Sequence, residues 1–289
     1  MVATTQKLRA KAMIRYCYHY LSALTRFKGY KPQPLTFRRI SSWIKQFSSD
    51  ERMQIIRLLD HVVYLPEAVV RTILVEQNNA LMRHLAEAGL PPEKMIYVQV
   101  HDAGSSSPVM LNLLRDATGL EQRGCHLLDS NDTLGLNRKT NELEEGALIY
   151  VDDFVGTGTQ FCKARDFAVR HISGNFSEFL IVPSICEEGF YLLGERGIAA
   201  FAGHVHSKVE RPLHANSTLL NKSAKKRMIE ICKKIDPKMG LGFQEIAAMV
   251  VLYRNAPNNM PVLFRGSVKQ TPYVGIFPRT TDLPIEDLS

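Results

Sequence analysis

The chain has few cysteines, and no two of them stand at metal-binding spacing. Its 289 residues include 5 cysteines, at positions 17, 125, 162, 186 and 232, with no Cys-x-x-Cys pair. An odd number without paired spacing argues against a disulfide framework and against a zinc cluster. We therefore expect a protein of a reducing compartment, the cytoplasm, with no structural metal of its own.

Long hydrophobic runs are also missing. No run reaches the roughly 18 apolar residues that a membrane-spanning helix requires, and residues 1–12 are polar and basic, unlike the apolar centre of an export signal. Hydrophobic residues make up 45% of the chain and charged residues 22%, as in an ordinary globular protein with a full core. The sequence therefore predicts no membrane contact.

The most informative segment is an apolar stretch that ends in two acidic residues. Residues 147–151 read Ala-Leu-Ile-Tyr-Val, as expected of a strand covered on both faces of a parallel sheet. After Asp152 and Asp153 comes a short loop, and helical spacing begins at Thr159. The loop consists of small residues, namely Gly156, Thr157, Gly158 and Thr159. Its glycines let the backbone approach a ligand, and the N–H groups of a new helix bind an anion.

This order of residues predicts a site for a ribose that carries a 5'-phosphate, with the carboxylates accepting hydrogen bonds from the ribose hydroxyls. Two better-known phosphate loops do not fit. A nucleoside-triphosphate loop needs a lysine where Thr159 and Gln160 stand, and a dinucleotide loop needs a third glycine where Phe161 stands. The acidic residues of a dinucleotide site also come after the loop, whereas here they precede it.

The segment resembles the phosphoribosyl diphosphate (PRPP) loop of the type I phosphoribosyltransferases. That loop has two acidic residues, two apolar residues and a run of threonine and glycine after a hydrophobic strand. The departures are Gly156 and Gln160, at positions where the backbone amide makes most of the contact. An ordinary strand–turn–helix corner with solvated aspartates remains the alternative.

The resemblance implies an α/β fold with a parallel-sheet phosphoribosyltransferase-like core. Apolar residues at helical spacing before the first strand predict an added N-terminal helical region, and the chain after the core is predicted to form a C-terminal α+β extension. We expect these regions at residues 1–94, 95–206 and 207–289. The predicted strands of the core are Ile96–Val100, Cys125–Leu128, Ala147–Val151, Glu178–Val182 and Ile198–Val205. The single tryptophan, Trp43, lies at helical spacing among apolar residues and is predicted to be in the core.

The resemblance also implies site residues outside the acidic loop. In the family, the loop after the first strand binds the diphosphate, which points here to Gly104, Ser105, Ser106 and Ser107. The alternative is a serine-rich helix start. The long polar stretch 129–145 corresponds to the flexible catalytic loop, so that Arg138 and Lys139 would act with Asp152 and Asp153 in catalysis. A charged surface loop is the alternative for these two basic residues.

Two further patterns involve histidines and lysines near the end of the core and after it. His204 and His206 stand at strand spacing and face one way, and we expect a satisfied pair rather than a zinc site. Leu220, Met228 and Ile235 belong to the apolar stripe of a helix whose other faces carry lysines. With a net charge of +7, this helix is either a solvated face or a surface for nucleic acid or a partner protein.

The whole chain also resembles phosphoribosyltransferase-like proteins of bacterial conflict and defence loci, including effectors that accompany retrons. The two resemblances imply a (phospho)ribosyl transferase or nucleotide-modifying effector of anti-phage defence. They also imply Mg2+ held mainly by the oxygens of PRPP. The alternative is a non-catalytic sensor of PRPP or a nucleotide that binds nucleic acid or a partner. The acceptor and the oligomeric state stay open.

Overall fold

The chain folds into two compact units. The computed structural model describes residues 16–100, 106–266 and 272–279. One unit, the sheet unit, consists of residues 68–207, and the other, the terminal unit, combines the chain up to Glu67 with the chain from Lys208 onward. Residues 68–94 of the expected N-terminal region thus belong to the sheet unit. The rest of that region shares a unit with the expected C-terminal extension.

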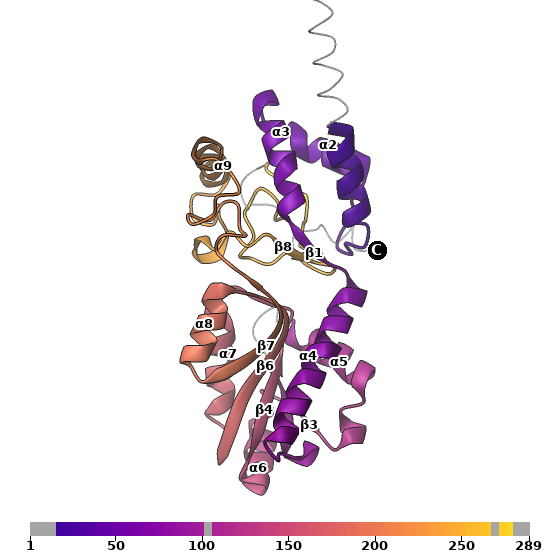
Figure 1. Cartoon of the computed structure of the whole chain (residues 1–289), viewed down its shortest axis with the longest axis vertical. Helices are drawn as coiled ribbons and strands as arrows, with labels where there is room; N and C mark the ends of the chain where they lie inside the picture. Colours follow the sequence, from indigo (N-terminus) through magenta and orange to yellow (C-terminus); the bar gives the residue numbers. More distant parts are fainter. Residues whose placement is uncertain (1–15, 101–105, 267–271, 280–289) are drawn as a thin grey trace, which may run out of the picture. The chain divides into compact units, whose positions relative to one another are not determined.

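Six parallel strands form the sheet unit (Figure 1). They are β2 (Met95–Gln99), β3 (His126–Asp129), β4 (Glu145–Val151), β5 (Phe154–Val155), β6 (Asn175–Cys186) and β7 (Ile198–His206). Their order is β3-β2-β4-β6-β7, and the short β5 also pairs with β6. All five predicted strands are present, and residues 147–151 are buried within β4. The predicted parallel-sheet α/β fold is therefore confirmed.

Helices cover both faces of this sheet. Alternate residues of the strands, such as Val98 and Leu180, form one hydrophobic cluster with Phe161 of α7 (Thr159–Val169) and Leu193 of α8 (Glu187–Glu195). On the opposite face the Tyr97 hydroxyl donates a 2.5 Å hydrogen bond to Asn78 of α4 (Glu67–Glu87). Figure 1 shows α7 and α8 on one side of the strands and α4 on the other. Burial on both faces explains why β4 has no polar alternation.

The polar stretch 129–145 is helical, so the prediction of a long flexible loop is wrong. It contains α6 (Thr133–Leu143), whose N-cap residue Asp132 accepts a 2.9 Å hydrogen bond from the Gly135 N–H. Leu136 and Thr140 are buried on its inner face. Leu136 and Leu143 stand seven residues apart, which is the repeat of an amphipathic helix. Four polar residues between them are exposed and form the solvent face, namely Asn137, Arg138, Asn141 and Glu142.

The terminal unit joins the two ends of the chain in one core. Its elements are α2 (Phe37–Lys45), α3 (Ser49–Leu58), β1 (Val63–Leu65), α9 (Lys222–Ile235) and β8 (Val250–Leu252). The strands β1 and β8 pair in parallel, although the sequence predicted only helices before residue 94. Trp43 is buried, and its indole N–H donates a 2.8 Å hydrogen bond to the Leu263 carbonyl, which confirms its place in the core. The Tyr30 hydroxyl donates a 2.5 Å bond to the Pro278 carbonyl.

The state of the cysteines and the apolar length of the helices can be read from the structure. All five cysteines are free, and four of them are buried, Cys17 being the exposed one. Burial raises the pKa of the Cys125 thiol to about 11. Across residues 16–100, 106–266 and 272–279, no helix is long and apolar enough to cross a membrane.

A nearly buried ion pair ties α7 to the sheet. The Arg165 Nε donates a 2.7 Å hydrogen bond to Glu178 of β6, and the Tyr150 hydroxyl donates a 2.8 Å bond to the same carboxylate. The Arg165 and Glu178 side chains are only 17% and 12% exposed. Hydrogen bonding to Glu178 raises the pKa of Arg165, and burial raises that of Tyr150.

We predict that Arg165→Met destabilises the protein by about 3 kcal/mol, because it leaves the Glu178 carboxylate in a nearly dry site without its cation. Denaturant unfolding followed by circular dichroism measures this change. The matched control is Arg115→Met, since Arg115 contacts Asp116 with side chains 40% and 62% exposed. We expect the control to change stability by no more than about 0.5 kcal/mol. If the two substitutions lower the free energy of unfolding equally, the pair of Arg165 and Glu178 stabilises the protein no more than an exposed ion pair does.

Candidate functional site

The acidic pair lies at the carboxyl end of β4, where parallel sheets bind their ligands. The last residue of β4, Val151, pairs with Ile181, and the Asp152 N–H donates a 3.1 Å hydrogen bond to the Ile181 carbonyl. Asp152 and Asp153 are half-buried, and the Asp153 N–H donates a 2.8 Å bond to the Asp152 carboxylate. The acidic pair therefore follows a central strand of the sheet, since β4 lies between β2 and β6.

A proline on the neighbouring strand accounts for the gap between β4 and β5. The pairs Val151–Ile181 and Phe154–Ser184 keep the same register, so that Pro183 stands opposite Asp153. Proline has no N–H and cannot continue the hydrogen-bond ladder. The hydrogen bonds between β4 and β6 therefore continue to the Asp152 N–H, are interrupted at Pro183 and resume in β5.

The loop after β5 leads directly into the N-terminus of α7. Gly158 has a φ of 80° and is the N-cap residue of α7. The Thr159 N–H donates a 3.4 Å hydrogen bond to the Thr157 hydroxyl oxygen, which lies 3.2 Å from the Thr159 hydroxyl. The first N–H groups of an 11-residue helix have no partner within the helix. Together with the helix dipole, they favour an anion at residues 156–159.

Helix α8 supports this loop through Gly189, which the sequence analysis did not single out. A Cβ on Gly189 would lie 2.6 Å from the Gly156 carbonyl oxygen and 3.3 Å from the Gly158 nitrogen. A Cβ on Gly158 would lie 3.2 Å from Leu192 of the same helix. A glycine inside an otherwise helical pattern was the available signal. Residue 189 must therefore lack a side chain for the loop to keep its path.

Ser106, the residue before α5 (Ser107–Thr118), contacts the acidic pair. The Ser106 hydroxyl donates a hydrogen bond to the Asp152 carboxylate. Ser106 precedes α5, but its side chain makes no capping hydrogen bond, so it is not merely a helix start. Ser107 is buried, and its hydroxyl oxygen accepts a 3.3 Å bond from the Val100 N–H. Gly104 and Ser105 lie outside the described residues.

Arg138 and Lys139 lie on α6 rather than on a loop. Arg138 is exposed, and the Lys139 ammonium donates a 2.7 Å hydrogen bond to Glu142, which lowers the pKa of that carboxyl. Helix α6 starts just after β3 and returns toward the start of β4. Arg138 is thus about 7 Å along the helix from its first residue. Nothing in the described contacts brings these two residues to Asp152.

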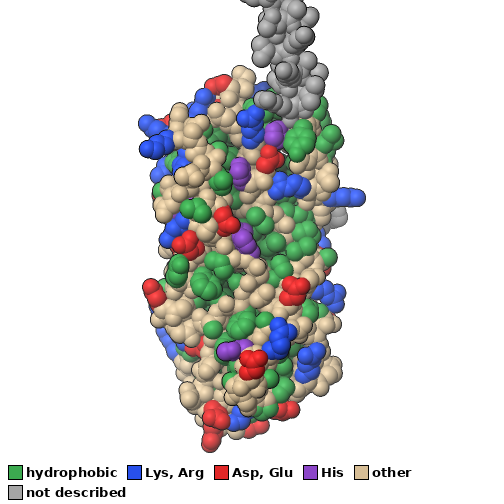
Figure 2. Space-filling view, viewed as in Figure 1, with side chains coloured by type: hydrophobic (Ala, Val, Ile, Leu, Met, Phe, Trp, Pro, Cys, Tyr) green, Lys and Arg blue, Asp and Glu red, His purple; other side chains and the backbone are tan. Residues whose placement is uncertain are grey.

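The basic helix α9 has most of its charges engaged within the terminal unit. The Lys225 ammonium donates to the carbonyls of His214, Ala215 and Ser217. Lys226 pairs with Glu230, Lys233 with Glu245, and Arg227 with Asp50 and Glu51. Lysine and arginine side chains still gather where α9 lies (Figure 2). They form a surface of mixed charge rather than a purely basic one.

Of three comparisons with known proteins, the one with family models identifies a family for this chain. A search of curated proteins returns no match. One solved structure, the AQ2163 protein from Aquifex aeolicus, is 12% identical over 60% of this chain and 86% of that chain, with a TM-score of 0.32. The family model PRTase-CE matches residues 40–279, which include parts of both units. The chain with the acidic pair, the glycine–threonine loop and the parallel sheet therefore belongs to PRTase-CE, a phosphoribosyltransferase-like family of conflict systems.

Proposed function

We propose that this protein binds PRPP or a related ribose 5-phosphate at the carboxyl end of β4. The observation that carries the proposal is the placement of Asp152 and Asp153 between a buried strand and an anion loop at the start of a helix. In the proposed complex the two carboxylates accept hydrogen bonds from the ribose hydroxyls. The N–H groups of residues 156–159 bind the 5'-phosphate. Ser106, which contacts Asp152, faces the diphosphate side of the ligand.

The proposed chemistry is a transfer of the ribosyl group. The bond between ribose C1 and the diphosphate oxygen breaks, the diphosphate departs with the electron pair, and a nitrogen nucleophile forms a new bond to the oxocarbenium-like C1. The protein contributes orientation and charge stabilisation rather than a covalent intermediate. The Asp152 and Asp153 carboxylates are hard oxygen donors of the kind that suits Mg2+. Bound mainly by substrate oxygens, this ion would neutralise diphosphate charge.

In a conflict system, the same pocket would act on nucleotides, nucleosides or similar molecules of the infected cell. Membership of PRTase-CE supports this role. The second candidate is a sensor that binds the ligand without turnover and contacts nucleic acid or a partner. Its support is the exposed face of α9, where Lys222 and Lys234 are exposed and have no ion pair among the described residues. Release of diphosphate from PRPP separates the transferase from the sensor.

We predict that the double variant Asp152→Asn, Asp153→Asn binds PRPP at least about 100-fold more weakly, because two charge-assisted hydrogen bonds to the ribose are lost. Isothermal titration calorimetry with PRPP and Mg2+ measures the loss. The amide side chains keep the size of the acids and can still accept from Ser106, so the sheet should remain folded.

The matched control for this variant is Asp116→Asn with Glu121→Gln. Both residues are exposed and belong to the same unit. This control removes two negative charges and should bind PRPP as the wild type does. Unchanged PRPP affinity in the Asp152 and Asp153 variant would refute the site. Equal losses in both variants would attribute the effect to overall charge.

Gly189 offers a test that leaves the ligand-binding groups in place. We predict that Gly189→Ala lowers PRPP affinity by about 10-fold or more, because the new methyl group displaces the Gly156 carbonyl and with it the anion loop. Gly194→Ala in the same helix is the control, since a Cβ there has nothing within 4 Å. The control should keep its affinity and gain up to about 1 kcal/mol of stability. If Gly189→Ala binds PRPP normally, the support that α8 gives to the loop is not needed for binding.

A further inference from the structure

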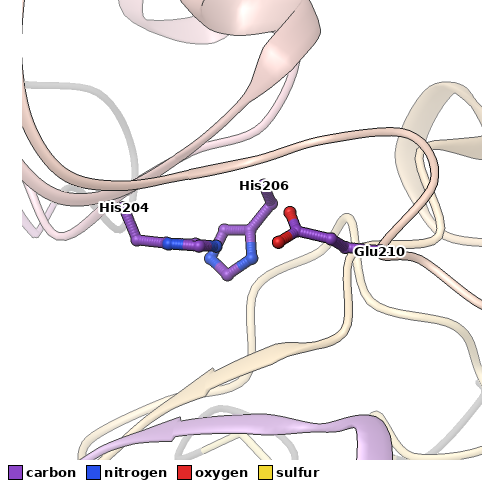
Figure 3. Close-up of side chains that lie close together, drawn as sticks. All are labelled: His204, His206 and Glu210. Atoms are coloured by element: carbon purple, nitrogen blue, oxygen red, sulfur yellow. The ribbon is translucent and has the colours of Figure 1, made fainter.

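The two histidines of β7 are engaged within the sheet unit. Figure 3 shows the His204 and His206 rings close together, with their centroids 4.3 Å apart. His206 is buried, and its Nε2 lies 2.5 Å from the hydroxyl oxygen of Ser184. This contact gives His206 the partner that we expected of a satisfied pair. The terminal unit, in contrast, has a cavity whose positive charge is not matched by an acidic residue.

This cavity lies beside α2 and has a volume of about 620 Å3. Sites for small molecules typically have roughly 300–1,000 Å3. Its lining comes from residues 33–46 and from Val274 and Gly275, which all belong to the terminal unit. The Gln46 amide joins these two parts, because it donates a 2.8 Å hydrogen bond to the Val274 carbonyl and accepts a 3.0 Å bond from the Val274 N–H. Hydrogen bonds within the protein therefore hold the two sides of the cavity in place.

The lining of the cavity is basic. It includes Arg38 and Arg39, and no aspartate or glutamate among the described residues. The sequence accounts for this composition. Residues 1–49 contain 10 lysines and arginines, residues 246–281 contain 4, and neither stretch contains an acidic residue. The net charge of the whole chain is only +7, so the rest of the chain is net negative. Both sides of the cavity thus come from acid-free parts of the sequence, which favours an anionic ligand.

Arg39 is a half-buried cation beside the cavity. Its Nε and one Nη donate hydrogen bonds of 3.0 and 3.2 Å to the Ile276 and Gly275 carbonyls. Burial lowers the pKa of this guanidinium. Within the described part of the chain, no carboxylate pairs with Arg39 or with the exposed Arg38. Charged groups that are withdrawn from water are usually paired. An anionic group in the cavity would supply the counter-charge that the protein itself does not.

The lining also offers apolar surface to the body of a ligand. Pro34, Trp43 and Val274 contribute to it. The Trp43 ring is held by its N–H bond to the Leu263 carbonyl and by packing against Phe264. Apolar walls with a few polar groups are the usual form of a site for an organic ligand. An inorganic anion would leave these walls in contact with water, so the cavity suits a ligand with both an anionic group and a flat apolar part.

We propose that this cavity binds a small phosphorylated molecule with a flat apolar body, of the mononucleotide class. Arg38 and Arg39 would bind the phosphate, because guanidinium groups match phosphate oxygens in geometry and charge. The body of the ligand would pack against Trp43 and Val274. A ligand that contacts α2 and residues 274–275 together would stabilise the terminal unit. The proposal uses no residue of the sheet unit and does not depend on PRPP binding.

The fluorescence of Trp43 tests the proposal, because this residue is the only tryptophan of the chain and lines the cavity. AMP is titrated into the full-length Asp152→Asn, Asp153→Asn variant, so that the proposed ribose 5-phosphate site does not contribute. We expect a saturable change with micromolar affinity. Adenosine, which lacks the phosphate, should give no saturable change. Inorganic phosphate, which lacks the apolar body, should bind at least about 10-fold more weakly than AMP.

Two substitutions in the same background locate the site. Arg38→Gln should weaken AMP binding by at least about 10-fold, through the loss of a charge-assisted hydrogen bond. Ser42→Phe should weaken it as strongly, because the ring fills the cavity while both arginines remain. The matched control is Lys45→Gln, which removes one positive charge from an exposed position of α2 outside the lining. This control should bind AMP within about 2-fold of its parent, since salt screens an exposed charge.

Three results would overturn the proposal. They are the absence of a saturable Trp43 response to AMP, equal losses in Arg38→Gln and Lys45→Gln, and full AMP binding by Ser42→Phe. A single-stranded oligonucleotide that binds with the same dependence on Arg38, without any response to AMP, would instead assign the arginines to a nucleic-acid surface. Circular dichroism verifies that each variant is folded. PRPP titrations of the wild type report on the site in the sheet unit, so the failure of one site is distinguishable from the failure of the other.

Discussion

The pairing of β4 with β6, buried on both faces, is the constraint on which the candidate site depends. It fixes where the acidic pair leaves the sheet, because the ladder runs to Val151 and stops opposite Pro183. Apolar burial of residues 147–151 stabilises the strand, and the missing N–H of one proline ends its pairing. The buried strand therefore sets the backbone position of the acidic pair, and the hydrogen bonds from Ser106 and the Asp153 N–H hold the Asp152 carboxylate.

Residue types predicted the central strand well, the anion loop stays a prediction, and long-range contacts account for what the residue types missed. The uninterrupted run 147–151 predicts a doubly covered strand, and the small residues after it predict an anion loop. The sequence did not predict helix α6, because polar residues far outnumber apolar ones in this segment and hide the spacing of Leu136 and Leu143. The three residues of β1 are too few to show a period, and only pairing with β8 makes them a strand. The contact between Ser106 and Asp152 and the support from Gly189 depend on where α5 and α8 lie, which residue spacing does not determine.

The sheet unit is an insertion within the terminal unit. The Arg39 guanidinium donates to the carbonyls of Gly275 and Ile276, and Tyr30 reaches Pro278. The core around Trp43 therefore needs residues from both ends of the chain. Contacts of such long sequence separation form late, because closing a long loop has an entropic cost. The strands of the sheet unit follow one another along the chain. During synthesis this unit can therefore fold before the C-terminal residues of the terminal unit are made.

The unchanged register across Pro183 also limits how this part of the chain can vary in length. Side chains alternate between the two faces of a strand, so one residue more or fewer between Val151 and Phe154 would reverse the faces of Phe154 and Val155. Val155 is buried and would turn outward. In the proposed function, substitutions at positions 152 and 153 would alter ligand binding, whereas an insertion there would displace the start of α7. The strand register therefore restricts the number of residues between Val151 and Phe154 as well as their type.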